Sequence, residues 1–348
     1  AARVQLEEVA MLAVLARQVL ARALIAIPMI FALSVVVFVV LRMLPADPLA
    51  MMLPPTATPT EIESLRAALG LDRSLPVQYG IWLSHALHGD LGRSITSGET
   101  VTHLIATTLP ATVELSVVAL VFSLIISIPG GLLLYALNKR RGELLADSFV
   151  VLLISVPSFL WGIFLMLLLG VMWPILPFSD RFGADIAPPK TTGFALIDFL
   201  LRGDFHAWGN AFSHLLLPAL ALALGFAPLI IRVLRASLLE AAGEQYAMVA
   251  RLRGQSDTRI VLRHMFKNAA LPTLTLIGVQ FGFLFGGTLL IEMIFSFPGL
   301  GNLMVQAVRN HDLPLIQGIA LVFCVIILVI NTCVDCLYTV VNPRLRDA

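Results

Sequence analysis

Six long apolar stretches decide what this chain can fold into. None of them contains a charged residue, and they cover residues 23–41, 115–137, 149–176, 215–231, 269–291 and 316–334. A helix needs roughly 20 apolar residues to cross a bilayer, and within the lipid only helices and closed barrels satisfy their own backbone groups. The sequence therefore predicts an all-α polytopic membrane protein with six transmembrane helices.

The composition agrees with a chain that is surrounded by membrane lipids. Hydrophobic residues make up 58% of it and charged residues 13%, against about 25% charged residues in soluble domains. The net charge of +1 gives no support to nucleic-acid binding. The first sixteen residues carry charges and no cleavage site after a short apolar core, so we expect no cleavable signal peptide.

A polar, helix-prone segment over residues 239–268 separates the fourth and fifth apolar stretches. Its basic residues outnumber its acidic ones, and they are Arg251, Arg253, Arg259, Arg263 and Lys267. Cytoplasmic loops carry the excess of Lys and Arg, so this segment is expected in the cytoplasm, with both termini on the same side. The opposite orientation would place the basic segment outside the cell.

This topology divides the chain into three parts. Residues 1–107 are expected to form an N-terminal transmembrane helix and a helical periplasmic cap, in which Thr58-Pro59-Thr60-Glu61 resembles a capping box. That helix would end at Gly70, and a second amphipathic helix would cover residues 77–87. Residues 108–338 would form a core of five helices that includes the loop 239–268, with an ordered outer excursion over 177–213. Residues 339–348 would be a cytoplasmic tail.

The sequence offers no catalytic centre. A phosphate-binding loop needs Gly-Lys-Ser/Thr, and none of the three lysines, Lys139, Lys190 and Lys267, follows a glycine. The pair Cys333 and Cys336 lies in or beside the last apolar stretch, which favours buried cysteines over a metal site. His85 and His88 could bind a metal, but a solvated helix face is favoured. The chain is therefore expected to be non-catalytic and to hold no metal or cofactor.

Polar residues at membrane depth are the candidates for a translocation path, because they are costly unless they face a cavity or a partner. The candidates are Gln280, Glu292, Asn331 and Asp335. Glu114, Glu292 and Asp335 lie near the ends of apolar stretches, so hydrogen bonding between helices or an interfacial position is the favoured explanation for them, whereas a place in the path and hydrogen bonding between helices remain equally open for Gln280. The absence of an array of such residues speaks against a proton relay.

Small residues recur along the fifth apolar stretch, at Gly278, Gly282, Gly286 and Gly287. Such spacing lets helices approach closely. The sequence leaves open whether these glycines pack within the chain or against a second subunit.

The basic segment resembles the ATPase-contacting motif of permease subunits in binding-protein-dependent ABC importers. The run from Gln245 to Gln255 matches the peptide branch of that family at Tyr246, Ala250, Arg251 and Gly254, with Arg253 in place of lysine. Glu240-Ala241-Ala242 is similar to the opening of the motif, although the glycine expected six residues after the glutamate would fall at Tyr246.

The resemblance extends over nearly the whole chain. It is carried by Arg42-Met43-Leu44-Pro45-Ala46-Asp47-Pro48, Leu109-Pro110-Ala111-Thr112-Val113-Glu114-Leu115, Ser155-Val156-Pro157-Ser158-Phe159, Phe295-Ser296-Phe297-Pro298-Gly299-Leu300-Gly301 and Asn342-Pro343-Arg344. Together these motifs resemble the B-type permease of the dipeptide, oligopeptide and nickel family.

This resemblance implies a type I ABC importer permease fold in the bacterial inner membrane. It implies four kinds of partner: a second homologous permease, one or two cytoplasmic ATPase subunits that bind ATP and Mg²⁺, a periplasmic or lipid-anchored binding protein, and membrane lipids. The residues that would couple the permease to its ATPase are Glu240, Tyr246, Ala250, Arg251, Arg253 and Gly254.

The substrate is less defined than the machinery. The stretch 192–198 resembles the dipeptide branch, whereas residues 250–254 are closer to the nickel branch. Peptides are favoured, and nickel, another small chelate or an opine is the alternative. A proton-driven secondary carrier or a signalling scaffold would not explain the basic segment.

Overall fold

The structure is a computed structural model that describes residues 2–43, 58, 60, 63, 72–188 and 191–341. The helix predicted from the capping box at Thr58 lies outside this part of the chain, and so does the side chain of Asp335. Within it, the only pairing of β type is an isolated bridge between Arg93 and Thr100. The predicted all-α class is confirmed.

The helices follow one another with few long connections. They are α1 (Ala2–Met43), α4 (Leu75–Leu87), α5 (Val101–Ala136), α6 (Glu143–Ser155), α7 (Ser158–Leu165), the π-helix η1 (Met166–Met172), α8 (Ala195–Leu201), α9 (Phe205–Gly243), α10 (Gln245–Leu252), α11 (Asp257–Ile260), the π-helix η2 (Val261–Met265), α12 (Phe266–Ile294), α13 (Leu300–Arg309) and α14 (Leu313–Val341).

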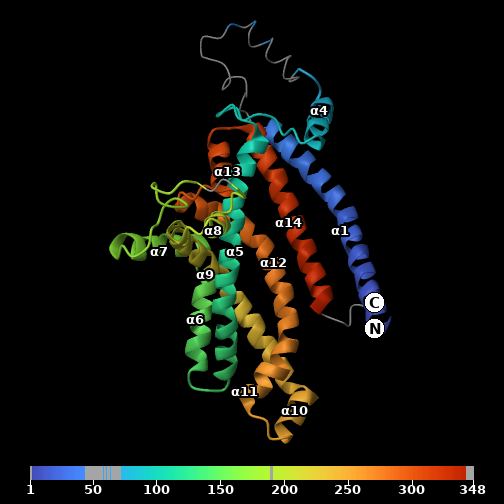
Figure 1. Cartoon of the computed structure of the whole chain (residues 1–348), viewed down its shortest axis with the longest axis vertical. Coiled ribbons are helices and arrows are strands. Elements are labelled where there is room, and N and C mark those ends of the chain that lie inside the picture. Colours follow the sequence, from blue (N-terminus) through green and yellow to red (C-terminus); the bar gives the residue numbers. More distant parts are fainter. Residues whose placement is uncertain are drawn as a thin grey trace.

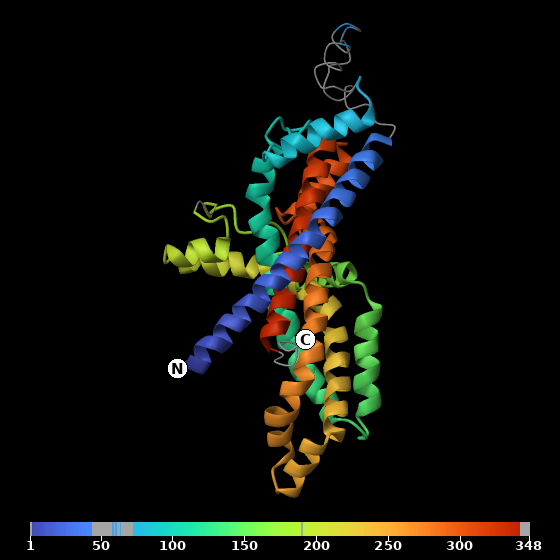
Figure 2. The same ribbon diagram turned by 90° about the vertical axis from the view of Figure 1, so that its right-hand side faces the viewer.

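The long helices form an elongated bundle with two distinct ends (Figure 1). Helices α10 and α11 form the tip at one end, whereas α4 and α13 lie at the other. Helices α5, α9 and α12 pack against one another in the middle, and α1 packs against α14. The view from the side shows α12 rising directly from the tip into the bundle (Figure 2). The tip is therefore joined to the bundle by continuous helix.

Five of the described helices are long and apolar enough to cross a membrane: Val19–Met43, Val101–Ala136, Phe205–Gly243, Asp257–Ile294 and Leu313–Val334. The single span predicted over 149–176 is instead broken into Glu143–Ser155 and Ser158–Met172, which meet at an angle of 96°. The break occurs at Pro157, which has no N–H to donate and forces the preceding residue out of the helical region. Val156 is accordingly extended, with φ −99° and ψ 117°. A sixth span exists only if this bent pair crosses as one.

Small residues allow α5 and α9 to lie close together along their length. Ala119, Ala219 and Ala221 are fully buried in the central cluster. Lower down, a methyl group at Gly130 would come within 2.8 Å of Ile231, and one at Gly131 within 2.8 Å of Leu234. Close approach through small residues is how membrane helices gain packing contacts in the absence of a hydrophobic driving force.

Three of the four glycines that the sequence analysis noted in α12 pack within the chain. Gly278 lies so close to Val334 of α14 that a methyl group would overlap its Cγ1, and Gly282 faces Asn331. Gly287 faces α9 through Leu222 and Phe226, and Gly286 has no atom within 4 Å of the position of a methyl group.

We expect Gly278→Ala to lower the unfolding temperature of the protein. The added methyl group must displace the stiff β-branched Val334, and overpacking of this kind costs about 1–3 kcal/mol. The double variant Gly278→Ala/Val334→Ala should recover most of the loss, as measured by thermal unfolding in detergent. Gly286→Ala is the matched control and should change little, since nothing lies in its way. Equal losses in both glycine variants would contradict this packing.

Candidate functional site

Helix α10 has one face that anchors it to the bundle. Ala247 and Ala250 are buried in a cluster with Leu234 and Leu238 of α9, and Tyr246 packs against the same cluster. The ring of Tyr246 is half-buried, and its hydroxyl makes no hydrogen bond within the described residues. Two of the predicted coupling residues, Tyr246 and Ala250, therefore hold α10 in place and do not face outward.

The opposite face of α10 is exposed. Arg251, four residues after Ala247, lies at the edge of this face, and Arg253 follows the last residue of α10. Both are exposed, and Arg251 makes only a long contact of 3.5 Å with the carbonyl oxygen of Ala242. Glu240 is also exposed, on the last turns of α9. The structure thus places the three charged candidates at the surface of the same tip.

Sequence reasoning missed the apolar part of this exposed face. Met248 is 60% exposed and Leu252 is 82% exposed, and they lie four residues apart on α10. Residues at that spacing lie one above the other on a helix. The signal in the sequence is that both apolar residues stand in a segment rich in polar and basic residues.

A tight turn separates α10 from α11. Gly254 has φ +74°, a left-handed conformation that glycine adopts without the steric penalty of a side chain. The side-chain oxygen Oε1 of Gln255 then accepts a hydrogen bond of 3.0 Å from Nε2 of His264 in η2. Gly254 thus allows the chain to turn tightly after α10. After this turn, α11, η2 and α12 follow one another without a break.

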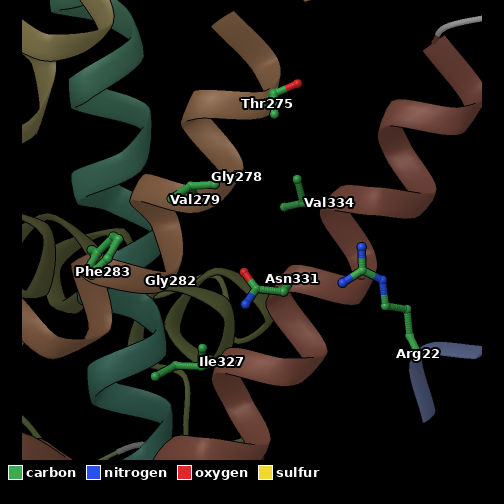
Figure 3. Close-up of a pocket in the computed structure, with 9 residues that line it drawn as sticks. All are labelled: Arg22, Thr275, Gly278, Val279, Gly282, Phe283, Ile327, Asn331 and Val334. Atoms are coloured by element: carbon green, nitrogen blue, oxygen red, sulfur yellow. The ribbon is translucent and has the colours of Figure 1, made fainter. Parts of the chain in front are cut away.

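The predicted path residues do not lie together. Asn331 of α14 borders a partly open cavity of about 380 Å³ between α12 and α14, where its amide points toward α12 (Figure 3). Gln280 is half-buried in α12 but does not line this cavity. Glu292 lies at the far end of α12 from the tip, and the side chain of Asp335 is outside the described residues.

Glu292 does not line an open path in this structure, because its side chain is fully buried. One carboxylate oxygen accepts a hydrogen bond of 2.7 Å from the hydroxyl of Thr112 in α5. The other accepts one of 3.0 Å from the backbone N–H of Asn302 at the start of α13. Thr112 in turn accepts from the N–H of Leu300 at 2.7 Å. Glu292 therefore supplies the cap that the first turn of α13 lacks in its own sequence.

Gly301, in the first turn of α13, also lies against this buried carboxylate. A methyl group there would lie 2.6 Å from the backbone of Leu289 and 2.9 Å from Glu292. The run Pro298-Gly299-Leu300-Gly301 thus packs around the carboxylate of Glu292. Gly299 and Gly301 lie so close to it that there is no room for a side chain.

A second buried carboxylate, Glu114 of α5, holds the excursion between η1 and α9. It accepts hydrogen bonds of 2.7 Å from Nη2 of Arg181 and 2.7 Å from the N–H of Leu196. Arg181 also donates to the carbonyl oxygen of Gly193 at 2.8 Å. The side chains of Arg181 and Glu114 are only 7% and 5% exposed. The excursion is thus tied to the bundle by a buried ion pair.

Asp198 organises the same excursion from within. The backbone N–H groups of Thr191, Thr192 and Gly193 and the hydroxyl of Thr192 all donate to its carboxylate. Burial by itself would raise the pKa of Asp198, but these hydrogen bonds outweigh it and hold that pKa below the usual range of an aspartate.

We expect the backbone amides of residues 191–198 to lose their protection from hydrogen exchange only at acidic pH. A carboxyl group with a lowered folded-state pKa contributes stability above its unfolded pKa of about 3.9, and that contribution is lost as pH falls through the folded value. Amide hydrogen exchange, corrected for its intrinsic pH dependence, should therefore accelerate in this loop below about pH 4. In Asp198→Asn the loop should exchange fast at neutral pH and show no such transition. Asp204→Asn is the control, because asparagine replaces an aspartate N-cap well. An acid transition that persists in Asp198→Asn would refute the assignment.

Asp312 is a third buried acid, which the sequence analysis did not single out. Its carboxylate accepts hydrogen bonds of 2.5 Å from the hydroxyl of Ser94 and 3.3 Å from the N–H of Leu315 at the start of α14. It joins the segment before α5 to α14. The end of the molecule opposite α10 is therefore held together by buried carboxylates.

Two family models match this chain. "Binding-protein-dependent transport system inner membrane component" matches residues 127–347, and the N-terminal part of the corresponding membrane component matches residues 11–116. The two matches together leave out only residues 1–10, 117–126 and 348.

Curated relatives are similar over almost the whole length. The dipeptide transport system permease protein DppB of Escherichia coli (strain K12) is 37% identical over 338 residues, which are 94% of this chain and 98% of that protein. The di/tripeptide transport system permease protein DppB of Pseudomonas aeruginosa (strain UCBPP-PA14) is 36% identical, over 92% of this chain and 96% of its own. The glutathione transport system permease protein GsiC of Shigella flexneri serotype 5b is 35% identical, over 94% and 98%.

Among solved structures, a chain of the MetNI methionine ABC transporter in an inward-facing conformation has the same fold. The TM-score is 0.52 at 15% sequence identity, over 69% of this chain and 96% of that chain.

Proposed function

This chain belongs to the family of binding-protein-dependent transport system inner membrane components, and from that premise we propose that it imports peptides. It is a permease subunit of an ABC importer in the bacterial inner membrane. Peptides are the proposed substrate class because two of the relatives are named for dipeptides or di- and tripeptides, and the third for glutathione, itself a tripeptide.

The second part of the proposal is that α10 docks onto a cytoplasmic ATPase subunit. The observation that carries it is the division of α10 into two faces. One face is fixed to α9 and η2 through Ala247 and Ala250. The other exposes Met248 and Leu252, and the exposed residues Arg251 and Arg253 lie beside it. Such a helix fits the groove of another protein, with apolar anchors and a charged rim.

The wider assembly follows from this docking. We place α10, α11 and both termini in the cytoplasm, where Lys and Arg are enriched, and count the bent pair α6–α7 as a sixth span. Residues 1–107 would be the first span with its outer cap, 108–338 the transport core and 339–348 a cytoplasmic tail, although residue 107 falls inside α5. The partners would be a second permease, ATPase subunits that hold ATP and Mg²⁺, and a substrate-binding protein on the outer side.

Among the four path candidates, Gln280 is the one we keep for the translocation path. It is half-buried near the middle of α12, the helix that continues from the docking tip. Glu292 links α5, α12 and α13 through buried hydrogen bonds. Asn331 lines the cavity between α12 and α14. The ATPase subunits would contact α10 differently in their two conformational states, and α12 would then move as a rigid body.

The test is to purify the chain with the proteins encoded beside it, reconstitute the complex in liposomes and measure ATP hydrolysis and uptake. We expect the binding protein loaded with a dipeptide to stimulate ATP hydrolysis and to support dipeptide accumulation. Uptake of a nickel chelate with no uptake of peptides would overturn the substrate. A chain that copurifies with no ATPase would overturn the docking.

A further inference from the structure

The turn that joins α5 to α6 carries three consecutive cations. The run Lys139-Arg140-Arg141 is exposed throughout, and its side chains make no ion pair within the described residues. The first two acids that follow it, Glu143 and Asp147 of α6, both pair with Arg235 of α9 instead. Four cations and two acids leave this corner of the molecule with a net charge of +2.

The backbone of this turn is held in one conformation. The N–H of Arg140 donates to the carbonyl oxygen of Leu137 at 2.9 Å, and the N–H of Glu143 donates to the carbonyl oxygen of Arg140 at 3.0 Å. Lys139 has φ +60°, in the left-handed region that residues with a side chain rarely adopt. Its N–H donates to Oε2 of Glu143 at 2.5 Å. The three cations therefore belong to an ordered turn, which lowers the ordering cost of binding a ligand there.

The turn lies where the apolar surface of the bundle begins on the α10 side. The uncharged stretch 115–137 ends two residues before Lys139. Just after the turn, Leu144 and Leu145 are each 76% exposed and Phe149 is 59% exposed. Both Figure 1 and Figure 2 show the turn at the same end as α10 but short of the tip, with α6 running from it away from the tip. Basic residues at such a boundary lie level with the phosphate layer of a bilayer.

We propose that this turn is a binding site for the headgroup of an anionic phospholipid in the membrane leaflet on the α10 side. The guanidinium groups of Arg140 and Arg141 would contact the phosphate, whose oxygens match their planar arrangement of donors. Lys139 would add a third positive charge, and an acyl chain would lie along Leu144 and Leu145. This proposal goes beyond peptide import, and only the name of the leaflet, cytoplasmic, depends on the proposed orientation.

The order of chemical groups favours a lipid over an acidic surface of an ATPase subunit. Cations come first and exposed apolar side chains follow along α6, in the direction away from the tip. A phospholipid presents a phosphate and then its acyl chains in the same order. A soluble subunit could cover the cations, but it would have to enter the bilayer to cover Leu144 and Leu145.

The experiment uses the intact importer complex in phosphatidylcholine nanodiscs with a small share of photoreactive lipid. That lipid is phosphatidylglycerol in one set and phosphatidylcholine in the other, and labelled peptides are located by mass spectrometry. We expect phosphatidylglycerol to label residues 142–152 at least about fivefold more, the factor that one basic side chain near an anionic membrane surface contributes. Residues 117–125 of α5, an exposed apolar surface without basic neighbours in the sequence, should be labelled equally by both lipids. Raising the salt to about 1 M should reduce the preference, because exposed charges are then screened.

The variants separate this turn from general positive charge. The double variant Arg140→Gln/Arg141→Gln should bring the preference close to unity, and it keeps the backbone hydrogen bonds of the turn. Arg140→Lys/Arg141→Lys should retain most of it. The matched control is Arg259→Gln/Arg263→Gln, which removes two exposed arginines from α11 and η2 near the tip and should leave the preference unchanged. Assembly of each variant is checked by copurification of the ATPase.

Three results would overturn the proposal. Equal labelling of residues 142–152 by the two lipids in the unaltered complex would mean ordinary surrounding lipid. An unchanged preference in Arg140→Gln/Arg141→Gln would exclude the phosphate contact. Weak labelling by both lipids, together with an amine-reactive crosslink from Lys139 to an ATPase subunit, would make the turn a protein contact. A failure of peptide uptake would leave all three readings unchanged, so the two proposals can fail separately.

Discussion

Replacement of Leu252 by aspartate is expected to abolish the stimulation of ATP hydrolysis by the binding protein while the permease remains folded. Leu252 is 82% exposed, so the change removes no packing from this chain. In the docked complex, burial of a leucine side chain contributes about 1.5–3 kcal/mol, which corresponds to about a 10- to 100-fold change in binding. A buried carboxylate without a partner adds a further penalty. Met248→Asp should act in the same direction.

The matched control is Leu262→Asp. Leu262 is also an exposed leucine, at 56% exposure, but it belongs to η2 and not to α10. Its replacement introduces the same charge at the same end of the molecule, and stimulation should persist. If both variants lose stimulation equally, general charge at the tip is responsible, and the specific docking of α10 is refuted. If Leu252→Asp retains stimulation, the docking surface lies elsewhere.

The fold followed from the sequence where one signal dominated. Apolar stretches without charge leave no alternative to helices in a membrane, so the helical class and the positions of α1, α5, α9, α12 and α14 could be predicted. The 96° bend between α6 and α7 could not. Pro157 indicates a local change in the direction of the helix. Proline kinks are tolerated within membrane helices, so the proline does not by itself divide the span in two. The size of the bend depends on packing against distant residues, for example Ser158 against Gly225.

The candidate site was predicted in position and only partly in its chemistry. The motif between Tyr246 and Gly254 falls on the short helix α10 at the tip, and the positive φ of Gly254 is one that glycine adopts readily. Which residues face outward depends on how α10 rests on α9, and that is a tertiary contact. Tyr246 and Ala250 therefore turned out to be anchors, whereas Met248 and Leu252 form the exposed surface.

Buried acids were the hardest residues to interpret from sequence. Glu114, Glu292 and Asp312 are separated by long stretches of chain from the groups that they bind, such as Arg181, Thr112 and Ser94. Nothing local in the sequence indicates such partners. In the structure all three serve the end opposite α10, where they join loops to α5, α12 and α14. These buried contacts tie the loops at that end to the long helices.

Glu114→Leu is expected to be among the most destabilising single changes in this chain. It leaves the guanidinium of Arg181 buried without its carboxylate, and removal of one partner of a buried pair costs about 3–5 kcal/mol. Thermal unfolding in detergent should show a lower midpoint temperature. Limited proteolysis should cleave the chain within residues 177–201 faster than in the unaltered protein. Asp147→Ala is the control at a more exposed pair with Arg235, where the loss should be small because solvent screens the charges.

The double variant Glu114→Leu/Arg181→Met should be more stable than Glu114→Leu alone. The pair is only partly satisfied, since Nη2 of Arg181 serves both Glu114 and Gly193 while its Nε makes no hydrogen bond within the described residues. The desolvation of two charges therefore outweighs much of their attraction, and apolar residues of similar size can replace such pairs at little cost. The N–H of Leu196 still loses its acceptor, which limits the recovery. If the double variant is as unstable as the single one, the pair itself stabilises the fold, and the excursion needs its charges as well as its packing.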